Sequence, residues 1–104
     1  MRSIMQKERE VCYLCGKPPY WTENGIYNGL EEHHVFGGAK NRKNSEKYGL
    51  KVYMHGIGCH RQGWESAHQR RATRLKLQRE AQLKFEEVYG SREEFVKIFG
   101  KNYL

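Results

Sequence analysis

Two adjacent imidazoles and a group of thiols are the side chains of this chain best suited to chemistry. His33 and His34 stand together in the segment LEEHHVFGG, residues 30–38. The other histidines and the cysteines fall in or just before the same part of the chain: Cys12, Cys15, His55, Cys59, His60 and His68. A lone histidine is most often a satisfied core or surface residue, but five beside three cysteines favour metal binding and proton transfer.

Two short-spaced pairs predict a structural metal site. Cys12 and Cys15 form the C-x-x-C of CYLC, and His55 and Cys59 bound the segment HGIGC. Together they offer a Cys3His ligand set, which is typical of a structural zinc, and in so small a domain metal binding would be part of folding. Two other interpretations remain open. One is a redox pair, although the βαβ setting of thioredoxin-like motifs is missing; the other is a merely buried Cys59 and a merely exposed His55.

A second, hydrolytic site is predicted from the remaining histidines. Three neutral imidazoles, His33, His60 and His68, would hold a divalent cation (Mg²⁺, Mn²⁺, Ni²⁺ or Zn²⁺) and leave one coordination position open. His34 would then act as general base on a water molecule. Successive side chains of a strand point to opposite faces, so the adjacent pair can share a site only where the strand bends or ends. Gly37–Gly38 makes such an end easier.

The composition is that of a small basic globular chain. It has 104 residues, of which 38% are hydrophobic and 30% charged, with a net charge of +7 and a pI of about 9.5. This charge favours a polyanionic partner, most often nucleic acid, over a basic surface with no dedicated partner. All acidic residues are glutamates, and an odd number of cysteines argues against a disulfide framework. Because there is no apolar run of membrane-spanning length and no apolar signal core, we expect a cytoplasmic protein without a membrane partner.

Hydrophobic patterning outlines the elements that must bring these side chains together. We expect an α+β domain with a zinc turn over 12–16, a loop over 20–29, and strands over 30–36 and 50–55. The segment between the strands reads as a basic loop with a short helical turn after Asn44. In the second strand, Leu50, Val52 and Met54 share one face.

Helix formers dominate from about residue 64. A stripe at helical spacing consists of Leu77, Ala81, Phe85 and Val88. Gly90 ends this helix, and Ser91 with Glu94 forms a capping box for a last helix that stops at Gly100. The aromatic C-terminal segment would pack on its own helices or on a second subunit, which leaves the oligomeric state open.

At EEHHVFGG, CH and SAH the sequence resembles HNH endonucleases of the ββα-metal type. More narrowly, it resembles the small phage and prophage members that carry a zinc-binding C-x-x-C. The matching stretches are CYLCG, EEHHVFGGAKNRKNSEKYGLKVYMH, CHRQGWESAH and KFEEVYGSREEFVKIFGKNYL. The resemblance implies one zinc-stabilised ββα-metal domain over 1–104, with a core at about 28–75 and C-terminal helices at about 64–100. It also implies a phage- or prophage-encoded, metal-dependent DNA endonuclease that acts in the host cytoplasm.

Family roles carry over by position. His33 resembles the metal ligand that is aspartate in many relatives, and His34 matches the general base. The remaining ligands of the catalytic ion match His60 and His68. The zinc-binding cysteines match Cys12, Cys15 and Cys59, with His55 in place of the usual fourth cysteine. For the central asparagine, which fixes the loop between the two strands, the candidates are Asn41 and Asn44.

Two basic runs are the expected DNA contacts. They consist of Lys40, Arg42 and Lys43 in the loop, and of Arg70, Arg71, Arg74 and Lys76 at the start of the helix. A solvated helix face is an equal interpretation of the second run. Two rival functions remain. One is a zinc-stabilised DNA-binding module with a degenerate, inactive HNH site; the other is a zinc module for protein interaction, in which the doubled histidine would be superfluous.

Overall fold

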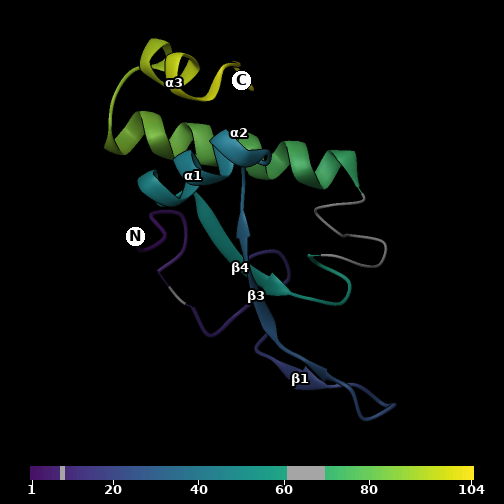
Figure 1. The fold of residues 1–104 in the computed structure, drawn as a ribbon. Helices are drawn as coiled ribbons and strands as arrows, with labels where there is room; N and C mark the ends of the chain where they lie inside the picture. Colours follow the sequence, from purple (N-terminus) through teal and green to yellow (C-terminus); the bar gives the residue numbers. More distant parts are fainter. Residues whose placement is uncertain (8, 61–69) are drawn as a thin grey trace.

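The computed structural model describes residues 1–7, 9–60 and 70–104. Within these residues the chain forms three helices and two small antiparallel sheets, which confirms the α+β class (Figure 1). In chain order the elements are β1 (Tyr20–Trp21), β2 (Tyr27–Asn28), β3 (Leu30–His34), α1 (Ala39–Tyr48), β4 (Lys51–His55), α2 (Arg71–Val88) and α3 (Arg92–Phe99). The molecule is elongated, with extents of 47 × 25 × 21 Å.

The pair β3–β4 carries three of the predicted site histidines: His33, His34 and His55. Its antiparallel register runs from Leu30 opposite His55 to His34 opposite Lys51. β3 ends at His34, two residues earlier than predicted, because Val35 and Phe36 turn into the core. The predicted second strand is confirmed as β4, which begins one residue later than predicted, at Lys51. Leu50, just before the strand, and Val52 and Met54 within it are fully buried.

The predicted loop between the strands is wrong, since ten of its residues form α1. This helix has no apolar stripe and is held by polar side chains, which is why hydrophobic periodicity did not predict it. Asn41 and Asn44 donate to the last carbonyls of α3, those of Phe99 and Ile98, at 3.1 and 3.2 Å. The two asparagines therefore fix the segment between the strands to α3.

Gly49 ends α1 and brings the N-terminal segment against the strands. Its φ of +70° is a left-handed conformation, and an added Cβ would collide with the carbonyl oxygen of Arg2. The Ile4 amide donates to the Gly49 carbonyl at 2.9 Å, and the Tyr53 amide donates to Gln6 Oε1 at 2.8 Å. The first residues thus pack along β4.

The segment 20–29, predicted as a loop, contains the hairpin β1–β2. Tyr20 pairs with Asn28 and Trp21 with Tyr27, around a turn in which Gly25 has a φ of +77°. An Asn-Gly pair between two aromatic segments is a hairpin signal, so the sequence did contain this information. Figure 1 shows the hairpin at the end of the molecule remote from the helices.

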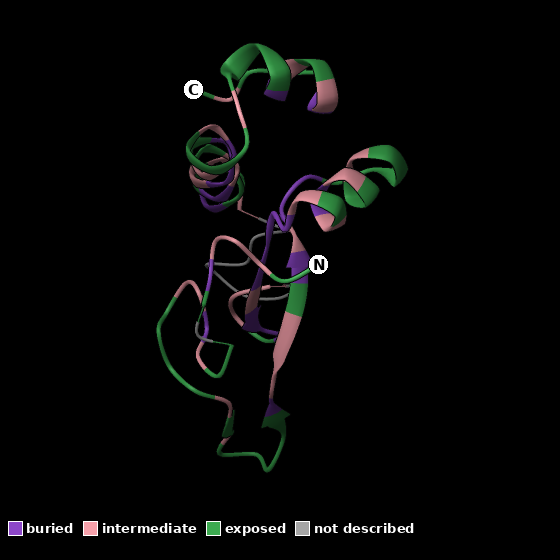
Figure 2. Cartoon of the chain, turned by 90° about the vertical axis from the view of Figure 1, so that its left-hand side faces the viewer, coloured by how far each residue is buried: buried purple, intermediate pink, exposed green. Residues whose placement is uncertain are grey.

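The helical layer supplies the other half of the core. α2 buries Leu77, Ala81 and Phe85 as predicted, but Val88 is 49% exposed at the end of the helix, so its assignment to the stripe is wrong. Thr73 and Gln82 are buried in addition. Figure 2 shows these buried positions gathered on one side of α2. The predicted start of the helix near residue 64 lies outside the described residues.

The last helix, α3, lies on the outer side of α2 (Figure 1). The Ser91 hydroxyl accepts from the Glu94 amide at 3.1 Å, and Gly100 ends the helix with a φ of +88°, which confirms both predicted boundaries. Phe95 and Phe99 are buried, and their rings stack with their centroids 4.7 Å apart. The C-terminal aromatics therefore pack within their own chain. Among the described residues, no helix has the length and apolarity of a membrane span.

Candidate functional site

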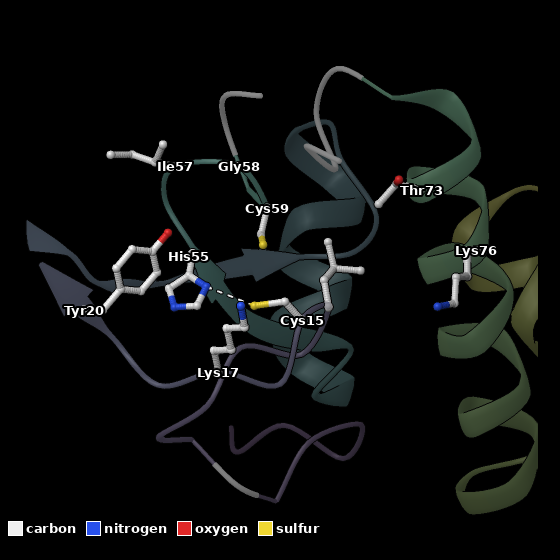
Figure 3. A pocket seen from close by; sticks show the side chains of 10 residues that line it. Cys15, Lys17, Tyr20, His55, Ile57, Gly58, Cys59, Thr73 and Lys76 are labelled. Atoms are coloured by element: carbon white, nitrogen blue, oxygen red, sulfur yellow. Dashed lines mark hydrogen bonds between the residues drawn. The ribbon is translucent and has the colours of Figure 1, made fainter. Parts of the chain in front are cut away.

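The predicted cysteine and histidine ligands of the structural site lie together. One ligand atom from each residue, all within 4.8 Å of one another, comes from Cys12, Cys15, His55 and Cys59. Cys12 and His55 are buried, and Cys15 is at the surface. Figure 3 shows the side chains of Cys15, His55 and Cys59 converging from separate segments beside a pocket of about 580 Å³.

The CYLC turn holds its two thiols by local backbone bonds and docks on the rest of the fold. The Gly16 amide donates to the Cys12 carbonyl at 2.8 Å, with Gly16 at a φ of +76°. The Tyr13 amide donates to the carbonyl of Tyr53 in β4 at 2.9 Å, and the Tyr13 hydroxyl donates to Glu80 of α2 at 3.0 Å. Burial, reinforced by Glu80, raises the pKa of Tyr13 to about 12. The turn is thus hydrogen-bonded to both β4 and α2.

The imidazole of His55 is oriented by a backbone carbonyl. Its Nε2–H donates to the Pro18 carbonyl at 2.9 Å, and its Nδ1 lies 3.3 Å from Cys15 Sγ (Figure 3). A carbonyl on one ring nitrogen fixes the tautomer and leaves the lone pair of the other nitrogen for a ligand. His55 therefore presents Nδ1, with its lone pair, to the thiols of the cluster.

The Cys59 thiol shows how the crowded sulfur atoms affect one another. Burial raises the pKa of Cys59 to about 12, and hydrogen bonding and charge from Cys12 and Cys15 add to the effect. Three thiolates crowded together repel one another, whereas a divalent cation between them favours their deprotonated forms. The donor set, its spacing and the oriented imidazole are all compatible with a structural metal ion.

A second pocket, of about 430 Å³, contains the adjacent histidines. His33, His34 and His60 line it together with Arg42 and Gly37–Gly38. The two adjacent side chains start from opposite faces of β3, yet both reach this pocket because the strand ends at His34. The sequence-based condition for a shared site is therefore met.

On one face of β3, His33 and His60 lie side by side. Their ring centroids are 4.9 Å apart, and His33 is 6% exposed. His60 Nδ1–H donates to Glu31 Oε1 at 2.8 Å, the kind of bond that orients a metal-binding imidazole. Gly56 leaves room for this carboxylate, since an added Cβ would lie 3.0 Å from it. The third predicted ligand, His68, lies outside the described residues.

On the other face, His34 belongs to an ion-pair network. Its Nε2 lies 2.8 Å from Glu46 Oε1 and 3.5 Å from Glu32 Oε1. These three residues have the spacing of a metal site. However, Lys51 Nζ already lies 3.0 Å from Glu46 and 3.2 Å from Glu32, and this ammonium supplies the positive charge that the carboxylates require.

The carboxylate of Glu46 is held in its ionised form. The hydrogen bond with His34, followed by those with the N-terminal amine and Lys51, lowers the pKa of Glu46 to about 2. Three residues of these networks were not among the predicted site residues: Glu31, Glu46 and Lys51. Strand alternation could have identified Glu31, because it shares a face with His33. The position of Glu46 beside His34 depends on α1, a helix that was not predicted.

The predicted phosphate contacts are mostly at the surface. Exposed positions are Lys40, Arg42 and Lys43 on α1 and Arg71, Arg74 and Lys76 on α2, while Arg70 is half-buried. Arg42 also lines the histidine pocket.

No family model, no curated protein and no solved structure matches this chain. The arguments for its function therefore come from its own sequence and geometry.

Proposed function

We propose that this chain is a metal-dependent DNA endonuclease of the HNH type, with a structural Zn²⁺ at the Cys3His cluster. One observation carries the proposal: the end of β3 brings His33 and His34, together with His60, to one pocket. A structural zinc module has no need of such a pocket. The resemblance at EEHHVFGG supports the same function.

In this proposal the two faces of β3 supply different roles. His33 and His60 bind a divalent cation, with His68 as a further ligand, and Glu31 orients His60. When bound, the cation polarises the phosphate and stabilises the leaving 3′ oxygen. His34 takes a proton from water, whose oxygen attacks phosphorus as the bond to the 3′ oxygen breaks.

The surroundings of the pocket suit a phosphate backbone. The N-terminus of α1 begins at its rim, with Gly38 at the N-cap, no side-chain cap and no acidic residue in the first turn. Such a helix end, with its open N–H groups and positive dipole, attracts phosphate. Arg42 adds a charge at the pocket, and the remaining exposed cations of α1 and α2 would contact the backbone on either side.

The test is nicking of supercoiled plasmid by wild type and His34→Ala, with Mg²⁺, Mn²⁺, Ni²⁺ or Zn²⁺ and with EDTA as the metal-free control. Both proteins are first shown to melt cooperatively and to carry one tightly bound zinc. We expect the wild type to nick with added metal and His34→Ala to be slower by about 10²- to 10⁴-fold, the usual contribution of a general base. If neither protein cuts any form of DNA yet both bind it in a salt-dependent way, the chain is an inactive DNA-binding module instead.

A further inference from the structure

Glu46 makes the closest polar contact of His34. Its Oε1 lies 2.8 Å from His34 Nε2, a normal hydrogen-bond length, whereas Glu32 is 3.5 Å away. The two partners come from different elements, the last residue of β3 and the last turn of α1. The contact therefore exists only because α1 folds back beside the strand.

Lys51 fixes the same carboxylate from the other side. Its ammonium lies 3.0 Å from both oxygens of Glu46, and its side chain is only 6% exposed. In the β3–β4 register Lys51 is directly opposite His34. A carboxylate held on both oxygens by a buried ammonium has little freedom to turn away from the imidazole.

An ionised carboxylate can only accept hydrogen bonds, so the proton of this contact belongs to His34 Nε2. In a neutral imidazole the other nitrogen, Nδ1, then carries the lone pair. We propose that Glu46 is a positioning residue, which keeps His34 protonated on Nε2 so that Nδ1 is the nitrogen that takes the proton from water. This proposal rests on the proposed function, since it concerns the base of the same reaction.

The proposal is tested with Glu46→Ala, which removes the acceptor but leaves Glu32 to pair with Lys51 at 3.2 Å. Glu87→Ala is the matched control, because Glu87 is an exposed glutamate of α2 that pairs with Lys84 at 3.4 Å, on a different helix from Glu46. The first measurement is the ¹⁵N spectrum of the imidazole rings, at a pH high enough for neutral rings. The signals of His34 are assigned by their loss in His34→Ala.

We expect a single His34 tautomer, protonated on Nε2, in the wild type and in Glu87→Ala, and a mixture of tautomers in Glu46→Ala. Nicking by Glu46→Ala should fall by about 10- to 100-fold, as is usual when the partner of an active-site histidine is removed. The bound zinc and the cooperative melting should be retained. A merely structural role would change melting but not the tautomer.

The outcomes separate the two proposals. An active Glu46→Ala variant that keeps the Nε2–H tautomer, or one that loses it with unchanged nicking, overturns the role of Glu46 and leaves the nuclease standing. A wild type that cuts no DNA overturns the proposed function itself, and the role of Glu46 in catalysis falls with it.

Discussion

The Cys3His cluster and the histidine pocket use similar side chains in different settings. In the cluster, four ligand atoms from two turns converge within 4.8 Å, and three of them are thiols that crowd one another. In the pocket, each of two histidines already has a carboxylate partner: Glu31 for His60 and Glu46 for His34. The cluster therefore has the donor set and spacing of a metal site, whereas the pocket is organised by protein contacts.

The histidine pocket also depends on the Cys3His cluster, whereas the cluster does not depend on the pocket. Cys59 belongs to the cluster, and the next residue, His60, lines the pocket. Loss of the cluster should release the segment that carries His60. The pocket, by contrast, contributes nothing to the contacts that hold the CYLC turn to Tyr53 and Glu80. Damage to the cluster should therefore disable both regions, and damage to the pocket only one.

The largest expected effect follows from breaking the cluster. Cys59→Ser, or removal of the metal with a strong chelator, should abolish zinc binding and cooperative melting together with nicking. The physical reason is that the apparent binding energy of a structural zinc, about 10 to 16 kcal/mol in zinc-finger peptides, exceeds the stability of a typical small domain. Zinc content and thermal melting followed by circular dichroism measure both losses.

The control for this prediction is His34→Ala, which should retain one zinc and the wild-type melting temperature. A zinc-free Cys59→Ser protein that melts like the wild type would show that the thiols do not hold a metal ion that stabilises the fold. That result would also remove the proposed asymmetry between the two regions.

A smaller effect is expected from the carboxylate behind His60. Glu31→Gln keeps the size of the side chain but weakens the hydrogen bond that orients the ring, now 2.8 Å long. The metal concentration needed for nicking should rise, or the rate at saturating metal should fall, by about 10- to 100-fold. Titration of nicking against Mg²⁺ or Mn²⁺ separates these two effects.

Glu23→Gln is a matched control for Glu31→Gln, because Glu23 is an exposed glutamate of the remote hairpin. Both variants should keep the structural zinc. An unchanged metal titration in Glu31→Gln would mean that this carboxylate does not support a metal ligand.

The cluster could be predicted from the sequence because its signal is local. Short ligand spacing and glycines indicate two turns, one at CYLCG and one at HGIGC. Only the approach of these two turns to each other depends on the fold. Strands β3 and β4 and helix α3 were predicted for the same reason, because the alternation in LKVYMH and the Ser91 cap lie within a few residues of the elements that they indicate.

The network around His34 could not be predicted in this way. Glu46 reaches it through α1, a helix stabilised by Asn41, Asn44 and the buried Ser45 instead of by an apolar face. Hydrophobic periodicity cannot detect a helix of this kind. Lys51 is buried at a position where strand alternation places the exposed face, and its burial follows from two carboxylates that come from other elements.

The smallest predicted effect lies in α3, which contributes to neither region directly. Ser91→Ala removes the hydroxyl that accepts from the Glu94 amide at 3.1 Å, and loss of such a cap costs about 1 kcal/mol. Urea denaturation of the zinc-bound protein should show this loss in the free energy of unfolding, with zinc content and nicking rate unchanged. α3 touches the surroundings of the pocket at two places: α1, by the bonds of Asn41 and Asn44, and Phe36, whose ring packs on Phe95 and Phe99. A fall in nicking without loss of zinc would therefore mean that the position of α1 or of Phe36 depends on an intact α3.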